Sequence, residues 1–91
     1  MKNYSEEKIE KNIVIRTFSE SANLEYDWHR DLEDRTIEVV NSGLGWKFQK
    51  DNDLPKLLVP GVKFFIEKMT FHRLIMGTGK LIIKITKHKK L

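Results

Sequence analysis

Residues 61–86 read GVKFFIEKMTFHRLIMGTGKLIIKIT and contain three short apolar segments that are separated by turns. These segments are residues 63–68, 71–76 and 80–86. In the last segment, Leu81, Ile83 and Ile85 occupy alternate positions. Residues two apart in a strand point to the same face, so this spacing predicts a strand with one apolar face. The sequence Gly77-Thr78-Gly79 before it predicts a turn.

The same alternation of short strand candidates and turns continues towards the N-terminus. Five more strand candidates are residues 12–18, 24–30, 35–41, 45–50 and 54–59. In the first of them, Ile13 and Ile15 alternate with Asn12 and Arg16. About eight short antiparallel strands must bury one face and protect their edges, which closure of the sheet achieves. The sequence therefore predicts an all-β protein, a small antiparallel β-barrel or jelly roll.

Length and composition indicate one domain over residues 1–91, with flexible ends at 1–11 and 87–91. The absence of cysteine excludes disulfides, thiolate metal sites and a cysteine nucleophile. A metal site would have to use Asp, Glu or the three histidines, which are His29, His72 and His88.

The formal net charge is +4, with acidic residues concentrated in the first half of the chain and lysines in the second. The basic end, KITKHKKL, is typical of a solvated tail, and no aromatic residues alternate with its lysines, so nucleic acid is not the expected partner. No apolar run approaches the length of a membrane span, and the polar N-terminus does not resemble a signal peptide. These features favour a cytoplasmic protein without a membrane partner.

Two distant segments carry the residues best suited to chemistry. His29 and Asp31 are two residues apart, so they can face one pocket from a strand, and barrel closure can bring His72 beside them. Two imidazoles and one carboxylate form a ligand set that suits ferrous iron and leaves coordination positions open. Without a metal, Asp31 would pair with a histidine or an arginine in a polar core cluster.

The segment from Gly61 onward resembles the second conserved motif of the cupin family. That motif has Gly, five residues, Pro, one residue, Gly, two residues, His, three residues and Asn. Here Gly61 and His72 keep their places, whereas Glu67, Met69 and Met76 stand at the Pro, the second Gly and the Asn.

The segment HRDLEDRTIEVVNSG is similar to the first cupin motif, which has His, one residue, His, three or four residues, Glu, six residues and Gly. His29, Asp31, Thr36 and Gly43 stand at its four marked positions. The two motifs together cover roughly residues 25–86, and in this order they identify the chain as a small single-domain cupin. The resemblance implies a double-stranded β-helix, the RmlC-like jelly-roll barrel.

The resemblance also implies one divalent metal, Fe, Mn, Ni or Zn, in the barrel pocket. Its ligands would be His29, Asp31 and His72, with Thr36 or Glu38 as possible additional residues near the metal. The chemistry implied is that of a metal-dependent oxygenase or isomerase acting on a small polar metabolite, and no catalytic residue is assigned. The alternative is a non-catalytic module that binds a sugar or another metabolite without metal. A homodimer is also expected, with the first predicted strand as the candidate edge.

Overall fold

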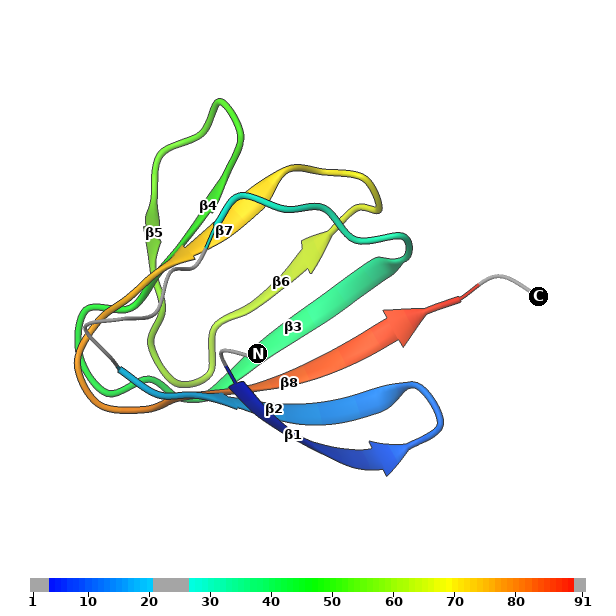
Figure 1. Cartoon of the computed structure of the whole chain (residues 1–91), viewed down its shortest axis with the longest axis horizontal. Coiled ribbons are helices and arrows are strands. Elements are labelled where there is room, and N and C mark those ends of the chain that lie inside the picture. Colours follow the sequence, from blue (N-terminus) through cyan, green and yellow to red (C-terminus); the bar gives the residue numbers. More distant parts are fainter. Residues whose placement is uncertain (1–3, 21–26, 90–91) are drawn as a thin grey trace.

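The computed structural model describes residues 4–20 and 27–89, and these residues form eight strands and no helix (Figure 1). The strands are β1 (Tyr4–Glu10), β2 (Ile13–Phe18), β3 (Asp34–Asn41), β4 (Lys47–Lys50), β5 (Lys56–Leu57), β6 (Lys63–Ile66), β7 (His72–Ile75) and β8 (Leu81–His88). The predicted all-β class is confirmed. Among the described residues there is no helix with the length and apolar character needed to cross a bilayer.

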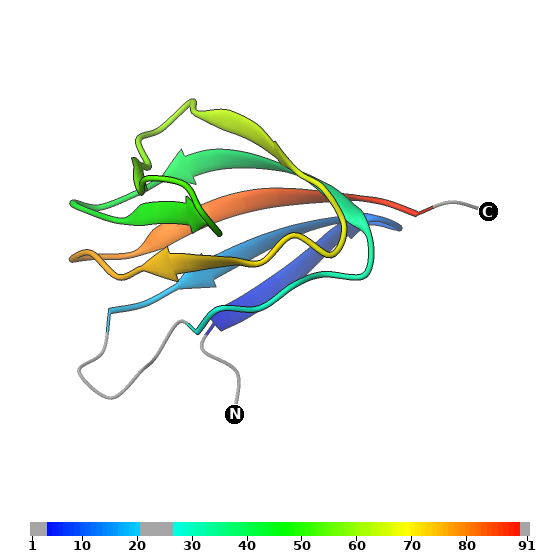
Figure 2. The same ribbon diagram turned by 90° about the horizontal axis from the view of Figure 1, so that it is seen from above.

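The strands form two antiparallel sheets. One has the order β1-β2-β8-β3-β6, and the other has the order β5-β4-β7. In Figure 1 the three-stranded sheet lies at the upper left and the larger sheet at the lower right. Figure 2 shows β3, β8, β2 and β1 side by side in one curved layer. The apolar core lies between the two sheets.

The N-terminal residues differ from expectation, because residues 4–10 form strand β1 rather than a flexible end. β1 pairs with β2 as a charged edge strand, and Glu6 forms an ion pair of 2.7 Å with Arg16. Charged residues protect an exposed sheet edge, which explains why this strand has little apolar content. At the other end, β8 continues to His88, into the tail that was expected to be flexible.

In β2, the alternating residues Ile13 and Ile15 are not the ones that face the core. Val14 and Phe18 are buried in the core, so Arg16, between them, lies on the inner face, and Ile13 and Ile15 lie on the outer face. Because β2 pairs with β1 on one side and with β8 on the other, it has no free edge for a partner subunit. The expected dimer contact through this strand is therefore wrong.

The first three residues of the candidate at residues 24–30 lie outside the described residues. Of its described part, His29 forms a single antiparallel bridge with His72 and no strand.

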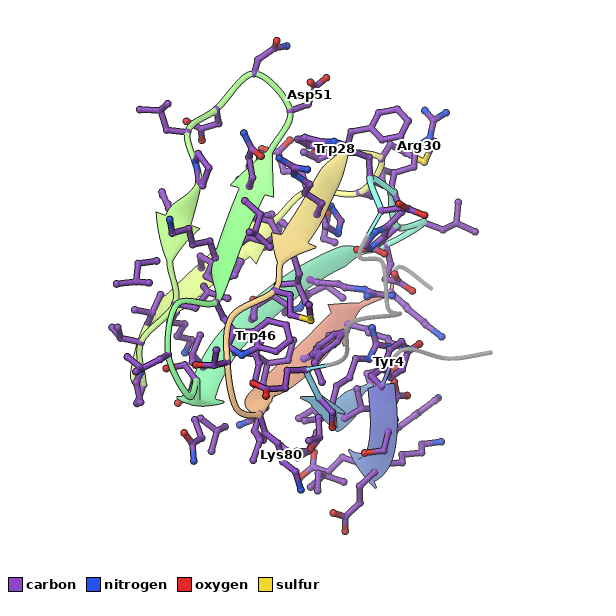
Figure 3. All side chains as sticks on the ribbon, turned by 60° about the vertical axis from the view of Figure 1, so that its left-hand side comes forward. Tyr4, Trp28, Arg30, Trp46, Asp51 and Lys80 are labelled. Atoms are coloured by element: carbon purple, nitrogen blue, oxygen red, sulfur yellow. The ribbon has the colours of Figure 1, made fainter. Side chains whose placement is uncertain are left out.

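One end of the barrel is closed by tightly packed loops. Trp46 is fully buried, and its Nε1 donates a hydrogen bond of 3.2 Å to the carbonyl of Gly79. In Figure 3, Trp46 and Lys80 lie at this end, while Trp28 and Arg30 lie towards the opposite end, beside β7. The histidines of the predicted metal site belong to that opposite end.

Candidate metal centre

Three side chains converge at the end of the barrel that carries Trp28. His29 and Asp31 come from the segment before β3, and His72 is the first residue of β7. One ligand atom from each of the three residues lies within 4.8 Å of the others. Asp31 and His72 are buried, at 8% and 5% exposure, whereas the His29 side chain is 54% exposed. The structure thus brings together the three residues that were expected to hold a metal.

Backbone pairing sets the positions of the two histidines. His29 N donates to the His72 carbonyl at 3.0 Å, and His72 N donates to the His29 carbonyl at 2.9 Å. This mutual pair is the bridge that joins residues far apart in the sequence. The two rings meet edge to face, with centroids 4.3 Å apart.

The ring protons of both histidines are directed away from the site. His29 Nδ1 donates to the Asp27 carbonyl at 3.0 Å, and His72 Nδ1 donates to the Thr70 carbonyl at 2.8 Å. A carbonyl can only accept, so each neutral ring carries its proton on Nδ1 and has a lone pair on Nε2. Such backbone contacts orient histidines that ligate metals.

The carboxylate of Asp31 lies opposite these lone pairs. Its Oδ2 is 3.4 Å from His72 Nε2, and its Oδ1 is 3.9 Å from His29 Nε2. Oδ2 is buried and has no hydrogen-bond partner among the described residues. Acceptors that face one another without a proton repel, and a cation between them removes both the repulsion and the cost of the unpaired buried oxygen. The donor set therefore fits a divalent transition metal.

Burial lowers the pKa of His72 below its ordinary value of 6.5, because desolvation disfavours the charged imidazolium. The positive charge of Arg35 and the neighbouring His29 also lower it, whereas the bond to the Thr70 carbonyl and the charge of Asp31 act in the opposite direction. His72 is therefore neutral at pH 7, the form in which a histidine binds metal.

Thr36 and Glu38 are not near this site. Both point to the outer face of β3, where they line a shallow polar groove with Lys84 and His88. Thr36 Oγ1 lies 2.8 Å from His88 Nε2, at hydrogen-bonding distance. Residues of β3 alternate between faces, so Arg35 and Ile37 point inward in their place. The expectation that Thr36 or Glu38 would stand near the metal is therefore wrong.

Arg35 is a residue of the site that the sequence did not single out. Its Nη1 lies 3.4 Å from Asp31 Oδ1, and its Nε donates to Glu33 at 3.0 Å. Arg35 directly precedes Thr36 in the sequence, but this position indicates a site residue only when it is known which residues of β3 face inward.

A cavity of about 350 Å³ adjoins the three residues and extends between the sheets. Its lining is mostly apolar and includes side chains from both sheets, among them Phe18, Ile37, Phe48, Phe64, Leu74 and Ile83. The aromatic residues Phe48 and Phe64 line it, whereas Trp28, Phe65 and Phe71 are between 39% and 46% exposed. Cavities of this size take small-molecule ligands.

Neither a family model nor a curated protein matches the sequence. The structure, however, is similar to solved ones. A structure from a study of the DMSP lyases RdDddP and RnDddQII matches with a TM-score of 0.72 and 19% identity, over 85% of this chain and 37% of that one. HppE with cobalt(II) and Tris buffer matches with a TM-score of 0.72 and 15% identity, over 97% of this chain and 55% of that one.

KdgF from Halomonas sp. is nearer in length, with a TM-score of 0.65 and 17% identity over 94% of this chain and 89% of that one. The chain thus spans little more than a third of the matched DMSP lyase chain and most of KdgF. These likenesses confirm the jelly-roll fold.

Proposed function

Because the chain has the cupin fold, we propose that it binds one divalent transition metal through His29, Asp31 and His72 and takes a small metabolite into the adjoining cavity. The observation that carries this proposal is the buried Oδ2 of Asp31, which faces the lone pair of His72 Nε2 at 3.4 Å without a proton between them. A cation supplies the missing positive partner.

The ligand types favour iron over the other candidate metals, which are Mn, Ni and Zn. Two imidazoles and one carboxylate are the set used by non-haem ferrous enzymes, and they leave positions open for other ligands. HppE, a structural neighbour, has been solved with iron(II) and with cobalt(II). A bound ferrous ion would supply Lewis acidity and a place for oxygen, so the reaction class that fits is oxygenation or isomerisation of a small metabolite.

Metal titration of protein purified without a histidine tag tests the proposal. After treatment with chelator, anaerobic addition of Fe(II) or Mn(II) should give one bound ion per chain. His72→Ala should bind at least about ten-fold more weakly, because one of three ligands is lost.

His88→Ala is the matched control, since it removes a histidine from the outer face. Binding that is equally weak in both variants, or equally strong, would contradict the assignment.

One observation favours the alternative, a binding module that needs no metal. Arg35 Nη1 lies 3.4 Å from Asp31 Oδ1 and already compensates part of the Asp31 charge. In that case a ligand of the cavity would stabilise the protein against heat to the same extent with and without chelator.

A further inference from the structure

Arg16 is a charged side chain on an otherwise apolar surface. The inward residues around it on β2 and β8 are Val14, Phe18, Leu81, Ile83 and Ile85, all of them buried and apolar. Arg16 is opposite Ile83 in the register of β2 and β8, and it lines the cavity. Its side chain is only 12% exposed. Withdrawing a guanidinium from water is costly unless it is paired and hydrogen-bonded.

The partner of Arg16 is a carboxylate from the edge strand β1. Arg16 Nε and Nη2 donate to Glu6 Oε2 at 2.9 and 2.7 Å, and the guanidinium lies 3.9 Å from the centre of the Tyr4 ring. Both bonds end on a single oxygen, whereas a guanidinium has five N–H donors in a planar fork that suits both oxygens of a carboxylate. The Glu6 side chain is 24% exposed and belongs to a strand with one hydrogen-bonded neighbour.

A purely structural role does not explain this arrangement well. Well-packed apolar residues are often as stabilising as a buried ion pair, or more so. Arg16, furthermore, lines the cavity, and the remaining walls of the cavity are mostly aromatic and aliphatic.

We propose that Arg16 binds the carboxylate of a small organic acid whose apolar body fills the cavity, and that Glu6 holds this position until the acid displaces it. The inference rests on the proposed role of the cavity as a ligand site, but it does not require the metal. It replaces the expected polar metabolite with an amphipathic one, a carboxylate on a hydrocarbon or aromatic body.

The register of the large sheet orients such a ligand. Arg16 is opposite Ile83, while Arg35, the residue beside Asp31, is opposite Lys87, four positions further along β8. Four residues span about 13 Å of a strand. An acid held at Arg16 therefore extends its body along the cavity towards His72 and Asp31.

The test compares benzoate with benzamide, its neutral analogue of similar shape, by calorimetry and thermal unfolding, first in chelator and then with cobalt(II). In chelator, millimolar benzoate should bind and raise Tm, while benzamide should bind at least about ten-fold more weakly, because a charge-assisted bidentate contact is lost. Arg16→Gln should reduce benzoate binding by a similar factor.

Glu6→Gln should strengthen benzoate binding several-fold, because the internal competitor loses its charge. Lys84→Gln is the control, since Lys84 lies on the outer face of the neighbouring strand. Glu6→Gln keeps the proposal testable if Arg16→Gln does not fold.

The proposal is overturned if benzoate does not bind, if benzamide binds equally well, or if Glu6→Gln fails to strengthen binding. Benzoate binding that requires cobalt(II) and ignores Arg16 would place the carboxylate on the metal and overturn it as well. Benzoate binding in chelator, in a protein that takes up no metal, would support this inference while contradicting the metal site.

Discussion

Met69 adopts a φ of 66°, in the turn that leads into β7 and His72. Its N–H donates to the Asp31 carbonyl at 2.8 Å, so the turn ties the backbone of one proposed ligand to the strand that carries another. Met69 stands where the second cupin motif has glycine, the residue that adopts positive φ without steric cost. The left-handed conformation of a residue with a Cβ costs roughly 1–2 kcal/mol.

Met69→Gly is therefore expected to stabilise the protein by up to about 1 kcal/mol, since the relief of strain exceeds the added entropy of the unfolded chain. Urea unfolding measures the change. Met69→Ala is the control, because it shortens the side chain but keeps the Cβ and the strain. Equal stability of the two variants would contradict this explanation.

His72 makes stability depend on pH in the metal-free protein. Its pKa is lowered in the folded state, so as pH falls below about 6.5 the unfolded chain takes up the proton before the folded protein does. The free energy of unfolding in chelator should therefore decrease as pH falls through 6.5, and this contribution should be constant above that pH.

Urea unfolding of the wild type and of His72→Asn at several pH values checks this sign. The decrease between pH 6.5 and the lowered pKa should be smaller in His72→Asn and unchanged in His88→Asn, which removes an exposed histidine. A wild type that becomes more stable as pH falls in this range would refute the expectation.

At the scale of elements, the loops at the closed end pack backbone against backbone. Leu44 and Thr78 form an antiparallel bridge, with N-to-O distances of 2.9 and 2.7 Å. A Cβ on Gly77 would collide with the Leu44 carbonyl oxygen and the backbone nitrogen of Trp46. This approach lets Trp46 close the barrel at the end opposite the proposed metal.

Gly77→Ala should lower the free energy of unfolding by about 1–3 kcal/mol, which is the usual cost of overpacking. Gly61→Ala is the comparison, because its φ is 91° but no atom lies within 4 Å of the added Cβ, so it should show the backbone strain alone. Urea unfolding measures both variants. A Gly77→Ala protein as stable as the wild type would show that these loops can separate at no cost.

For the whole molecule, the uneven charge of the sequence is evened out by strand pairing. β8, from the basic half, lies between β2 and β3, from the acidic half, and Lys84 is opposite Glu38 in their register. Opposite charges at paired positions on a sheet stabilise it by roughly 0.2–1 kcal/mol. The net charge of +4 is thus the sum of two halves that are interleaved in one sheet.

A metal that binds only the folded state should raise the stability of the whole molecule. At a free metal concentration of a hundred times the dissociation constant, binding raises the free energy of unfolding by about 2.7 kcal/mol. We expect Tm to rise when cobalt(II) is added to the wild type and to fall again with chelator.

Asp31→Asn keeps the shape of the side chain but removes its charge, so it should fold and lose the cobalt-dependent rise. Thr36→Ala, on the outer face, should keep it. A rise in Tm that persists in Asp31→Asn would place the ion elsewhere.

The sequence by itself determined the strands whose apolar residues alternate. β8, with Leu81, Ile83 and Ile85 buried on one face, is the clearest case, because its pattern depends only on the two-residue period of a strand. The cupin fold and the meeting of His29, Asp31 and His72 were also predictable, through the spacing of the two motifs.

Only the tertiary structure decided what depends on pairing between distant strands. It placed Arg16 inside the barrel and Thr36 and Glu38 outside, and it made a strand of the charged residues 4–10. β1 is a strand because it pairs with the edge of β2. β2 and β3 have apolar residues on both faces, so the local sequence pattern could not decide which of the two faces is buried. The physical reason is that register and sheet order come from long-range hydrogen bonds, and a shift of one residue exchanges the inner and outer faces.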